Sequence, residues 1–162
     1  MMKSRGRKVF VRVYFKKIHA DAIIPTKAYQ DDAGIDFYSI EDVVVPAKGF
    51  GIVRTGLKCE LVVDNDYELI PYLQIIDKSG MAFKRNLHVV AGVVDAGFRG
   101  EITIKLWNFG DEDVFIKKHQ KIAQGIVFLV PFVLTSETDT LSESERGEGG
   151  FGSTGEFFSE TK

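Results

Sequence analysis

Short apolar runs separated by turn residues are the feature that most limits what this chain can fold into. The runs lie at residues 9–18, 43–45, 52–55, 57–62, 67–75, 92–107, 114–116 and 122–133. The first run alternates, with Val11, Val13 and Phe15 set against Arg12, Tyr14 and Lys16, which is typical of a strand with one buried face. Proline, glycine, Asp or Asn separates many of the runs. Evenly spaced short strands of this kind predict an all-β sandwich, jelly roll or barrel.

The composition divides the chain into three parts. Residues 1–8 are a basic leader that we expect to be disordered, and residues 9–134 contain the strands. One helix is expected in that folded domain, beginning near Ser79, because serine is a common N-cap and residues 81–84 tolerate a helix. Residues 135–162 are rich in Ser, Thr, acidic residues and glycine, so we expect a flexible C-terminal arm with little to pack.

Charge and cysteine content limit the compartment and the partners. The net charge of −2 argues against general affinity for nucleic acid. No apolar run approaches the ~20 residues that a membrane span needs, and the basic leader is not followed by the apolar stretch of a secretory signal. Cys59 is the single cysteine, which favours the cytoplasm or another reducing intracellular compartment and excludes a cysteine-based metal cluster.

The stretch 92–101 reads as the tip of a β-hairpin that carries Asp95. Residues 89–94 form an unbroken run of small apolar side chains and Ala91-Gly92, and residues 102–107 alternate between apolar and other side chains. Gly97 can take a positive φ, and aspartate tolerates tight bends, so the local sequence predicts a turn here. On this stretch alone Asp95 is most simply a turn residue.

The C-terminal arm contains an unusual glycine cluster at residues 146–155. Arg146, Phe151, Ser153 and Thr154 lie among five glycines. Backbone N–H groups and an arginine can grip phosphate, while an aromatic ring can stack on a flat base, so this segment could fold over a ligand. The residues 135–145 before it could extend about 35 Å and reach a neighbouring subunit.

Five segments, in order, resemble the motifs of the trimeric dUTP pyrophosphatase (dUTPase) family. They are residues 32–36, 78–82, 91–101, 121–124 and 146–155, and together they span most of the chain. The resemblance implies a distorted jelly-roll or β-barrel subunit with one short helix, and a homotrimer with active sites between subunits and the arm supplied by another chain. It also implies hydrolysis of dUTP to dUMP and pyrophosphate by water attack on the α-phosphorus, which limits uracil in DNA and supplies dUMP.

The resemblance assigns roles to residues of the central stretch and the arm. Asp95 would accept the proton of the attacking water, because an ordinary aspartate is ionised at pH 7. Backbone groups from Val89 to Gly92 would read uracil and leave cytosine unpaired. Phe98, where the family usually has tyrosine, would pack beneath the deoxyribose, and Phe151 would stack on uracil. The simpler alternatives are a turn residue for Asp95 and a core residue for Phe98.

The remaining motifs would hold the triphosphate. The phosphate-binding residues implied by the resemblance are Lys78, Ser79, Gly80, Gln124, Arg146, Ser153 and Thr154. Mg²⁺ would arrive bound through the substrate triphosphate, with no direct protein ligands, and Asp36 would orient its water shell or organise the site. Asp36 could equally be a loop residue that caps a strand end.

Besides Phe98, this sequence departs from the family pattern at three further places. The usual Pro-Arg-Ser-Gly is Asp77-Lys78-Ser79-Gly80, which keeps a positive charge but loses the bidentate fork of arginine. His119-Gln120 stands in place of a Gly-Asp turn, and Gly125 stands in place of an aliphatic residue. The changes at His119-Gln120 and Gly125 bear on the local turn and on strand packing. The sequence does not say where the Asp77 side chain points.

Two other function classes share parts of this pattern. The related dCTP deaminases carry a glutamate in the strand after the aspartate, where this chain has Lys105. A dUTPase-like regulatory module that binds a nucleotide or a partner protein is the other alternative, although no long insertion separates the motifs. His19, His88 and His119 are scattered in the sequence, which indicates surface or structural residues rather than a metal site.

Overall fold

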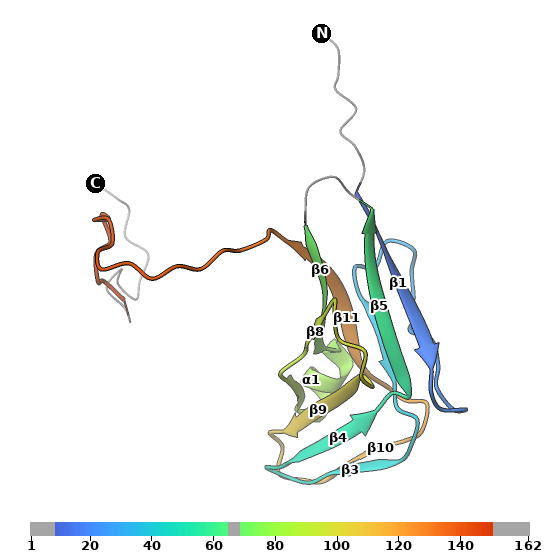
Figure 1. The fold of residues 1–162 in the computed structure, drawn as a ribbon. Helices are drawn as coiled ribbons and strands as arrows, with labels where there is room; N and C mark the ends of the chain where they lie inside the picture. Colours follow the sequence, from blue (N-terminus) through green and yellow to red (C-terminus); the bar gives the residue numbers. More distant parts are fainter. Residues whose placement is uncertain (1–8, 65–68, 151–162) are drawn as a thin grey trace. The chain divides into compact units, whose positions relative to one another are not determined.

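Antiparallel strand pairing accounts for nearly all the regular structure. The computed structural model describes residues 9–64 and 69–150. The elements in these residues are β1 (Phe10–Lys17), β2 (Ile35–Tyr38), β3 (Val43–Val45), β4 (Phe50–Arg54), β5 (Leu57–Asp64), β6 (Ile70–Asp77), α1 (Ser79–Arg85), β7 (Leu87–Val90), β8 (Val93–Asp95), β9 (Thr103–Asn108), β10 (Val114–Ile116) and β11 (Lys121–Val130). The expected all-β class with one short helix is confirmed (Figure 1).

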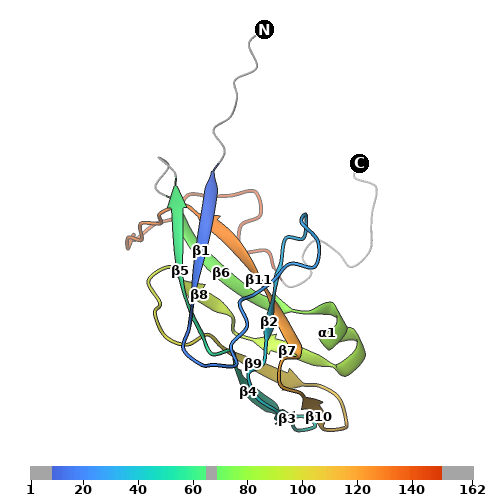
Figure 2. The same cartoon turned by 90° about the vertical axis from the view of Figure 1, so that its right-hand side faces the viewer.

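The strands form four small sheets. Their orders are β1–β5, β10–β3, β2–β11–β6–β8 and β4–β9–β7, and every pairing is antiparallel. Most neighbours in these sheets are distant in sequence, as when β11 inserts between β2 and β6. In both ribbon views β5 runs alongside β6, while β3, β4 and β10 gather at the opposite end from the start of β1 (Figures 1 and 2).

The core is filled from all four sheets. Fully buried side chains come from β2, β3, β4, β5, β6, β7, β9, β10 and β11, and the largest of them include Phe37, Leu57, Leu73 and Leu106. In β9 the burial alternates residue by residue, with Ile104 and Leu106 buried as predicted. Each fully buried aliphatic or aromatic side chain contributes about 1.5–3 kcal/mol, so this alternation is what holds the sheets together.

Gly125 of β11 leaves room for two of these core side chains. A Cβ on Gly125 would lie 2.7 Å from the Phe37 ring and 2.8 Å from Leu73 Cδ1. Both contacts are closer than real Cβ atoms accept, and both neighbours are fully buried. The departure of this position from the family pattern therefore has a packing reason.

The turn before β11 forms without the glycine of the family pattern. His119 takes φ 64°, in the left-handed region that glycine adopts at least cost. The turn is closed by hydrogen bonds from Gln120 N to Lys117 O at 3.0 Å and from His119 N to Ser39 O at 2.8 Å. The substitution changes the strain in the turn rather than its path.

The predicted hairpin around Asp95 is only partly correct. Its outer arms do pair, with Val89 opposite Leu106 in the β7–β9 ladder. The predicted unbroken strand over residues 89–94 is wrong, because Ala91 (φ 69°) and Gly92 (φ 128°) turn the chain, and β8 then pairs with β6. Gly97 is not among the residues with positive φ, although a turn does close there through Phe98 N to Asp95 O at 3.0 Å.

The helix begins at Ser79 as predicted, but Ser79 is not its N-cap. Lys78, and not Ser79, is the N-cap residue, and its side chain makes no capping hydrogen bond. Ser79 is the first helical residue and is exposed. The helix ends at Asn86, which takes the left-handed conformation (φ 52°) typical of a helix C-terminus.

Residues 133–162 form a second compact unit, separate from residues 1–132. Its described part, residues 133–150, contains turns but no helix or strand. Within it Arg146 Nε donates to Gly149 O at 2.7 Å, and Gly149 N donates to Arg146 O at 3.0 Å. In the part of the chain that the structure describes, no helix has the length and apolar character needed to cross a bilayer.

Candidate active site

A cavity of about 440 Å³ opens beside the central stretch of the sequence. Its walls come from β7, β8, β9 and the loops between them, and they are mainly apolar. The lining residues are Ile52, Ile75, Val89, Val90, Ala91, Gly92, Val93, Val94, Asp95, Phe98, Glu101, Ile102, Thr103, Ile104 and Lys105. Four predicted site residues, Val89, Gly92, Asp95 and Phe98, are thus brought together. A largely apolar pocket with a few polar groups, here Asp95, Glu101 and Lys105, is typical of a small-molecule site.

Gly92 is the residue that lets the chain turn from β7 into β8 at this wall. Its φ of 128° is strained for any residue with a side chain, and a Cβ there would clash with the Ile75 carbonyl oxygen. Its own carbonyl accepts a hydrogen bond from Ile75 N at 2.7 Å. Glycine is therefore required both by conformation and by close approach to β6.

Asp95 is the last residue of β8 and lies opposite Tyr72 of β6. Its side chain is exposed, and no hydrogen bond or ion pair to it is present among the described residues. A carboxylate without an internal partner at the edge of a cavity is available to accept a proton from water or to bind a donor group.

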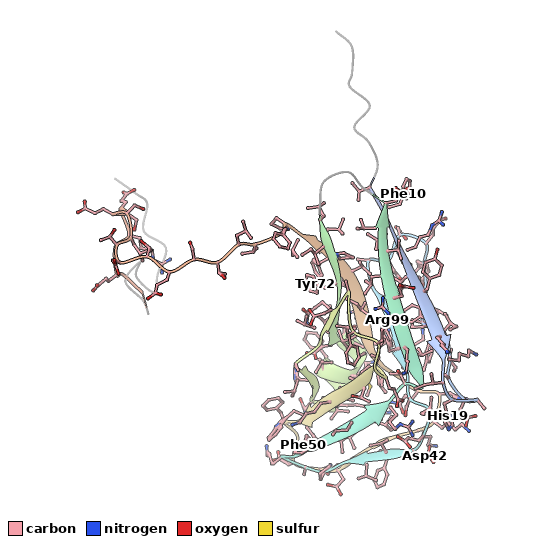
Figure 3. All side chains as sticks on the ribbon, viewed as in Figure 1. Phe10, His19, Asp42, Phe50, Tyr72 and Arg99 are labelled. Atoms are coloured by element: carbon pink, nitrogen blue, oxygen red, sulfur yellow. The ribbon has the colours of Figure 1, made fainter. Side chains whose placement is uncertain are left out.

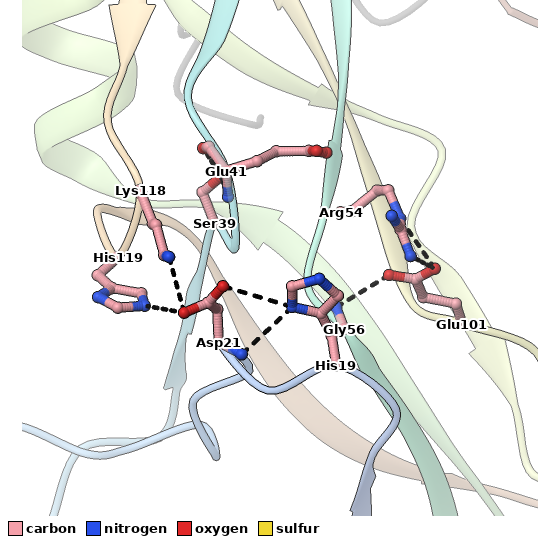
Figure 4. A network of polar contacts seen from close by, with 9 residues as sticks. All are labelled: His19, Asp21, Ser39, Glu41, Arg54, Gly56, Glu101, Lys118 and His119. Atoms are coloured by element: carbon pink, nitrogen blue, oxygen red, sulfur yellow. Dashed lines mark hydrogen bonds and ion pairs between the residues drawn. The ribbon is translucent and has the colours of Figure 1, made fainter.

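The loop that follows Asp95 is fastened at two points. Arg99, labelled in Figure 3, donates to Ala96 O at 2.6 Å and to Glu60 of β5 at 2.9 Å. Glu101 accepts from Arg54 at 3.0 Å and from Gly56 N at 2.9 Å (Figure 4). Arg99 and Glu101 lie within the third motif, residues 91–101, but the sequence alone suggested no role for them.

Phe98 directly precedes Arg99, the first of these two anchor residues. Its side chain is 45% exposed, so it is not the core residue that the simpler alternative expected. A Cβ on Gly100 would lie 2.8 Å from Phe98 Cε2 and closer still to Cζ, so the tip of the ring lies against this glycine. One face of the cavity mouth is therefore an exposed aromatic ring.

A second cluster of polar residues gathers around Asp36 of β2. The carboxylate accepts from Lys78 Nζ at 2.7 Å through Oδ1 and from Lys121 Nζ at 2.7 Å through Oδ2. Burial by itself raises the pKa of Asp36, but the hydrogen bonds from Lys121 and Lys78 outweigh it, so the pKa is lowered overall. The hydrogen bond that Lys121 donates to Asp36 also raises the pKa of Lys121. Asp36 lies within a strand, not in a loop, and sequence reasoning missed Lys121.

Gln124 and Asp77 lie next to this cluster. In the register of β11, Gln124 is opposite Asp36 on one side and Ile76 on the other. Gln124 Nε2 donates to Asp77 O at 2.9 Å, while its Oε1 lies against Gly34. Gly80 is exposed with open space where a Cβ would point, so the surface at the start of α1 is free to receive a ligand.

The three histidines each lie beside an aspartate. His88 Nδ1 is 2.7 Å from Asp77 Oδ2, and His19 and His119 lie 3.7 Å and 4.0 Å from Asp21 (Figure 4). Lys118 Nζ also contacts Asp21 at 2.7 Å and lowers the pKa of that carboxyl. His19 and His119 are distant in sequence, yet they converge on one carboxylate. Among the described residues no group of three or more His, Cys, Asp or Glu side chains could hold a metal ion.

Asp95 and Lys78 are far apart within one chain. Asp95 is opposite Tyr72, and Lys78 follows Tyr72 by six positions along β6 and just beyond its end. At about 3.3 Å per residue, the strand separates them by about 20 Å. Arg146 belongs to the second unit, and Phe151, Ser153 and Thr154 lie outside the described residues.

Comparison with known proteins identifies the family. The dUTPase family model matches residues 20–155. A deoxyuridine 5'-triphosphate nucleotidohydrolase of Clostridioides difficile is 44% identical over 142 residues, which covers 86% of this chain and 95% of the relative. The chain belongs to the dUTPase family.

Solved structures show the same fold for this dUTPase. The dUTPase of Staphylococcus bacteriophage 80alpha with dUPNHPP superimposes with a TM-score of 0.77 at 23% identity, covering 89% of this chain and 98% of that one. A variant dUTPase from phage phi11 of S. aureus, which coordinates a structural Mg(II) ion, gives a TM-score of 0.65 at 20% identity, covering 83% and 99%. The jelly-roll subunit expected from the sequence is confirmed.

Proposed function

We propose that this dUTPase hydrolyses dUTP to dUMP and pyrophosphate, with the Asp95 carboxylate taking a proton from the water that attacks the α-phosphorus. The observation that carries the proposal is the Asp95 side chain on the apolar cavity of residues 89–105, where no described residue pairs with it. An ionised carboxylate within hydrogen-bond reach of water makes that water a better nucleophile at the moment of attack, and general-base assistance of this kind contributes about 10²–10⁴-fold in rate.

The cavity would hold the nucleoside. Its apolar wall would pack against uracil, and backbone groups of residues 89–92 would read the edge of the base. The Val89 amide already donates to Asp77, and the Gly92 carbonyl already accepts from Ile75, so the reading groups are expected among the remaining polar atoms of this segment. The exposed Phe98 ring would lie beneath the deoxyribose, where its bulk would disfavour a 2′-hydroxyl.

The cluster around Asp36 would hold the phosphates. Its two lysines and one carboxylate leave an excess of one positive charge next to Ser79, Gly80 and Gln124. Asp36 has both oxygens engaged by lysines, which supports the role of organising these cations rather than orienting the water shell of a metal. In the arm, Arg146, Ser153 and Thr154 would close on the phosphates and Phe151 would stack on uracil.

Magnesium use is supported for the family by the Mg(II) ion of the phage phi11 relative. The residues of this chain fit a metal that the substrate itself carries, because Mg²⁺ prefers oxygen ligands, retains several waters and needs few protein ligands. Bound in this way, it would neutralise part of the triphosphate charge. Lys78 and Lys121 would then bind and orient the remaining phosphate oxygens.

Assembly as a homotrimer would complete the site. The Asp95 carboxylate, as the general base, must act next to the α-phosphorus, and reacting atoms must approach to about 3–3.5 Å. Since about 20 Å of β6 separates Asp95 from Lys78 within one chain, a single subunit cannot supply both. A neighbouring copy that brings its Asp36 cluster to the first copy's cavity would satisfy the geometry, and the arm would come from another chain.

Pyrophosphate release from dUTP, dTTP, dCTP and UTP tests the reaction. We expect release from dUTP alone at a substantial rate, and a loss of about 10²–10⁴-fold in kcat for Asp95→Asn. Asp111→Asn, an exposed change on the β9–β10 loop, is the matched control. Wild-type protein that binds dUTP without releasing pyrophosphate would favour the regulatory module, and ammonia release from dCTP would favour the deaminase.

Mixed trimers test the shared site. Asp95→Asn and Ser79→Ala subunits are each expected to be inactive, but co-expression should restore about a quarter of wild-type activity. In a random mixture about one site in four combines a native Asp95 from one chain with a native Ser79 from its neighbour. Mixed trimers, verified by mass spectrometry, that remain inactive would contradict assembly of the site from two subunits. Deletion of residues 146–162 should leave a folded trimer and lower activity by orders of magnitude.

A further inference from the structure

The side chain of Asp77 makes contacts that the family pattern does not provide. Asp77 is the last residue of β6 and stands where the family pattern has proline, which has no carboxylate. Oδ1 accepts from Val89 N at 2.6 Å, and Oδ2 lies 2.7 Å from His88 Nδ1. Its backbone carbonyl accepts from Gln124 Nε2 at 2.9 Å. One residue thus ties β7 to β6 and β11.

The bond to Val89 replaces a missing strand partner. β7 is an edge strand in the order β4–β9–β7, so the side of β7 away from β9 has no neighbouring strand. An edge N–H needs an acceptor, and a carboxylate forms a stronger bond than a neutral carbonyl. The Asp77 carboxylate therefore restrains β7 at the residue that lines the cavity.

The same contacts fix the side of the cavity that would meet the base. Val89 and Val90 line the cavity from β7, and Ile104 and Lys105 line it from β9. His88 is held from two directions, because its ring also packs edge-on against Phe109 with the centroids 5.3 Å apart. If β7 moved outward, this wall would move with it and the cavity would widen.

We infer that Asp77 is a positioning residue that fixes the width of the base pocket and so raises selectivity for uracil over thymine. The inference rests on the proposed hydrolysis of dUTP. Thymine differs from uracil by one methyl group, and a rigid apolar pocket discriminates against one extra methyl by about 10–200-fold. If β7 is free to move outward, the pocket admits the methyl group of thymine, and part of this discrimination against dTTP is lost.

The test compares kcat and KM for dUTP and dTTP in Asp77→Ala, Asp77→Asn and His88→Ala. In Asp77→Ala we expect the ratio of kcat/KM for dUTP to that for dTTP to fall about 10-fold, with most of the loss for dUTP in KM. Asp77→Asn keeps an oxygen acceptor for Val89 N, so its ratio should stay within about threefold of wild type. His88→Ala keeps the Val89 bond and should behave like the asparagine variant.

A second readout follows the backbone itself. Hydrogen exchange of the Val89 amide should be slow in wild type and in Asp77→Asn and at least 10-fold faster in Asp77→Ala. If the alanine variant does not fold, Asp77→Glu takes its place, because the longer carboxylate displaces Val89 and should also lower the ratio.

The outcomes separate the two proposals. Folded Asp77→Ala protein with an unchanged ratio would overturn the positioning role, as would an asparagine variant that loses as much selectivity as alanine. Wild-type protein that releases no pyrophosphate from dUTP would instead overturn the proposed function.

Discussion

Asp36 is expected to stabilise the fold only while its carboxylate is ionised. Asp36→Asn removes the charge and keeps the shape. The carboxylate is 8% exposed and receives one hydrogen bond from each of two lysines, both at 2.7 Å. In the variant the amide oxygen can still accept from one lysine, while the amide N–H₂ faces the other cation.

The expected cost follows from these contacts. A hydrogen bond to a charged group contributes about 1.5–3 kcal/mol when it is protected from water. The side chains of Lys78 and Lys121 are 31% and 40% exposed, so both recover hydration when the carboxylate is lost. Two bonds at the lower end of this range contribute about 3 kcal/mol, and the one weaker bond that persists in the variant retains about 1 kcal/mol. The expected loss in the free energy of unfolding is therefore about 2 kcal/mol. For a domain of this size that lowers Tm by about 4–8 °C.

The pH dependence gives the sharper test. The pKa of Asp36 in the folded protein is lowered, because the lysine hydrogen bonds outweigh burial. A carboxyl group with a lowered folded pKa contributes stability above its unfolded pKa of about 3.9, and this contribution is lost as the pH falls through the folded pKa. The free-energy difference between wild type and Asp36→Asn should therefore be full at pH 7 and shrink below about pH 4.

Urea unfolding followed by tryptophan fluorescence measures this difference, since Trp107 is the single tryptophan. The protein concentration must be held fixed across all samples, because trimer assembly shifts the apparent stability. Glu112→Gln is the control, since this exposed side chain has no ion pair among the described residues. A difference that is absent at pH 7, or that persists undiminished as the pH falls below 4, would refute the reasoning.

Three further substitutions test the packing and the turns by thermal unfolding. Gly125→Ala should cost about 1–3 kcal/mol, because the new Cβ overlaps the buried Phe37 ring and Leu73; an unchanged Tm would mean that the core yields there. Gly92→Ala should cost at least about 3 kcal/mol, since φ 128° and the Ile75 carbonyl both oppose a side chain; wild-type stability would contradict that strain. His119→Gly should raise Tm by about 1–2 °C by relieving φ 64°, and a clear loss of stability would show that its contact with Asp21 matters more.

Strands with one buried face could be predicted well from the sequence. Val13 and Phe15 of β1, and Ile104 and Leu106 of β9, lie on the core side of their strands as the alternation required. The signal is strong because shifting a strand by one residue would expose its whole apolar face. β2 was not predicted, because the polar Asp36 interrupts its four residues, whereas the even shorter β3 and β10 are uniformly apolar.

The wrong predictions around Asp95 and Ser79 have a different origin. Residues 89–94 are uniformly apolar, so periodicity could not show that the chain turns at Ala91 and changes its partner from β9 to β6. The helix start depended on the end of β6, which carries the chain to Lys78 as the N-cap and leaves Ser79 exposed. Both details are set by strand pairing between distant residues, which a single sequence does not reveal.

The motifs predict the site residues but not their division in space. Asp36, Lys78 and Gln124 come from three segments, and the β2–β11–β6 order brings them together as one cluster. Asp95 lies in the same sheet, on β8, yet its register on β6 keeps it about 20 Å from Lys78. The sheet that brings Asp36, Lys78 and Gln124 together therefore also separates this cluster from Asp95, the proposed general base. In the proposed mechanism both would be needed within a few ångströms of one phosphorus atom, so the register of β8 on β6 favours a catalytic unit that contains more than one chain.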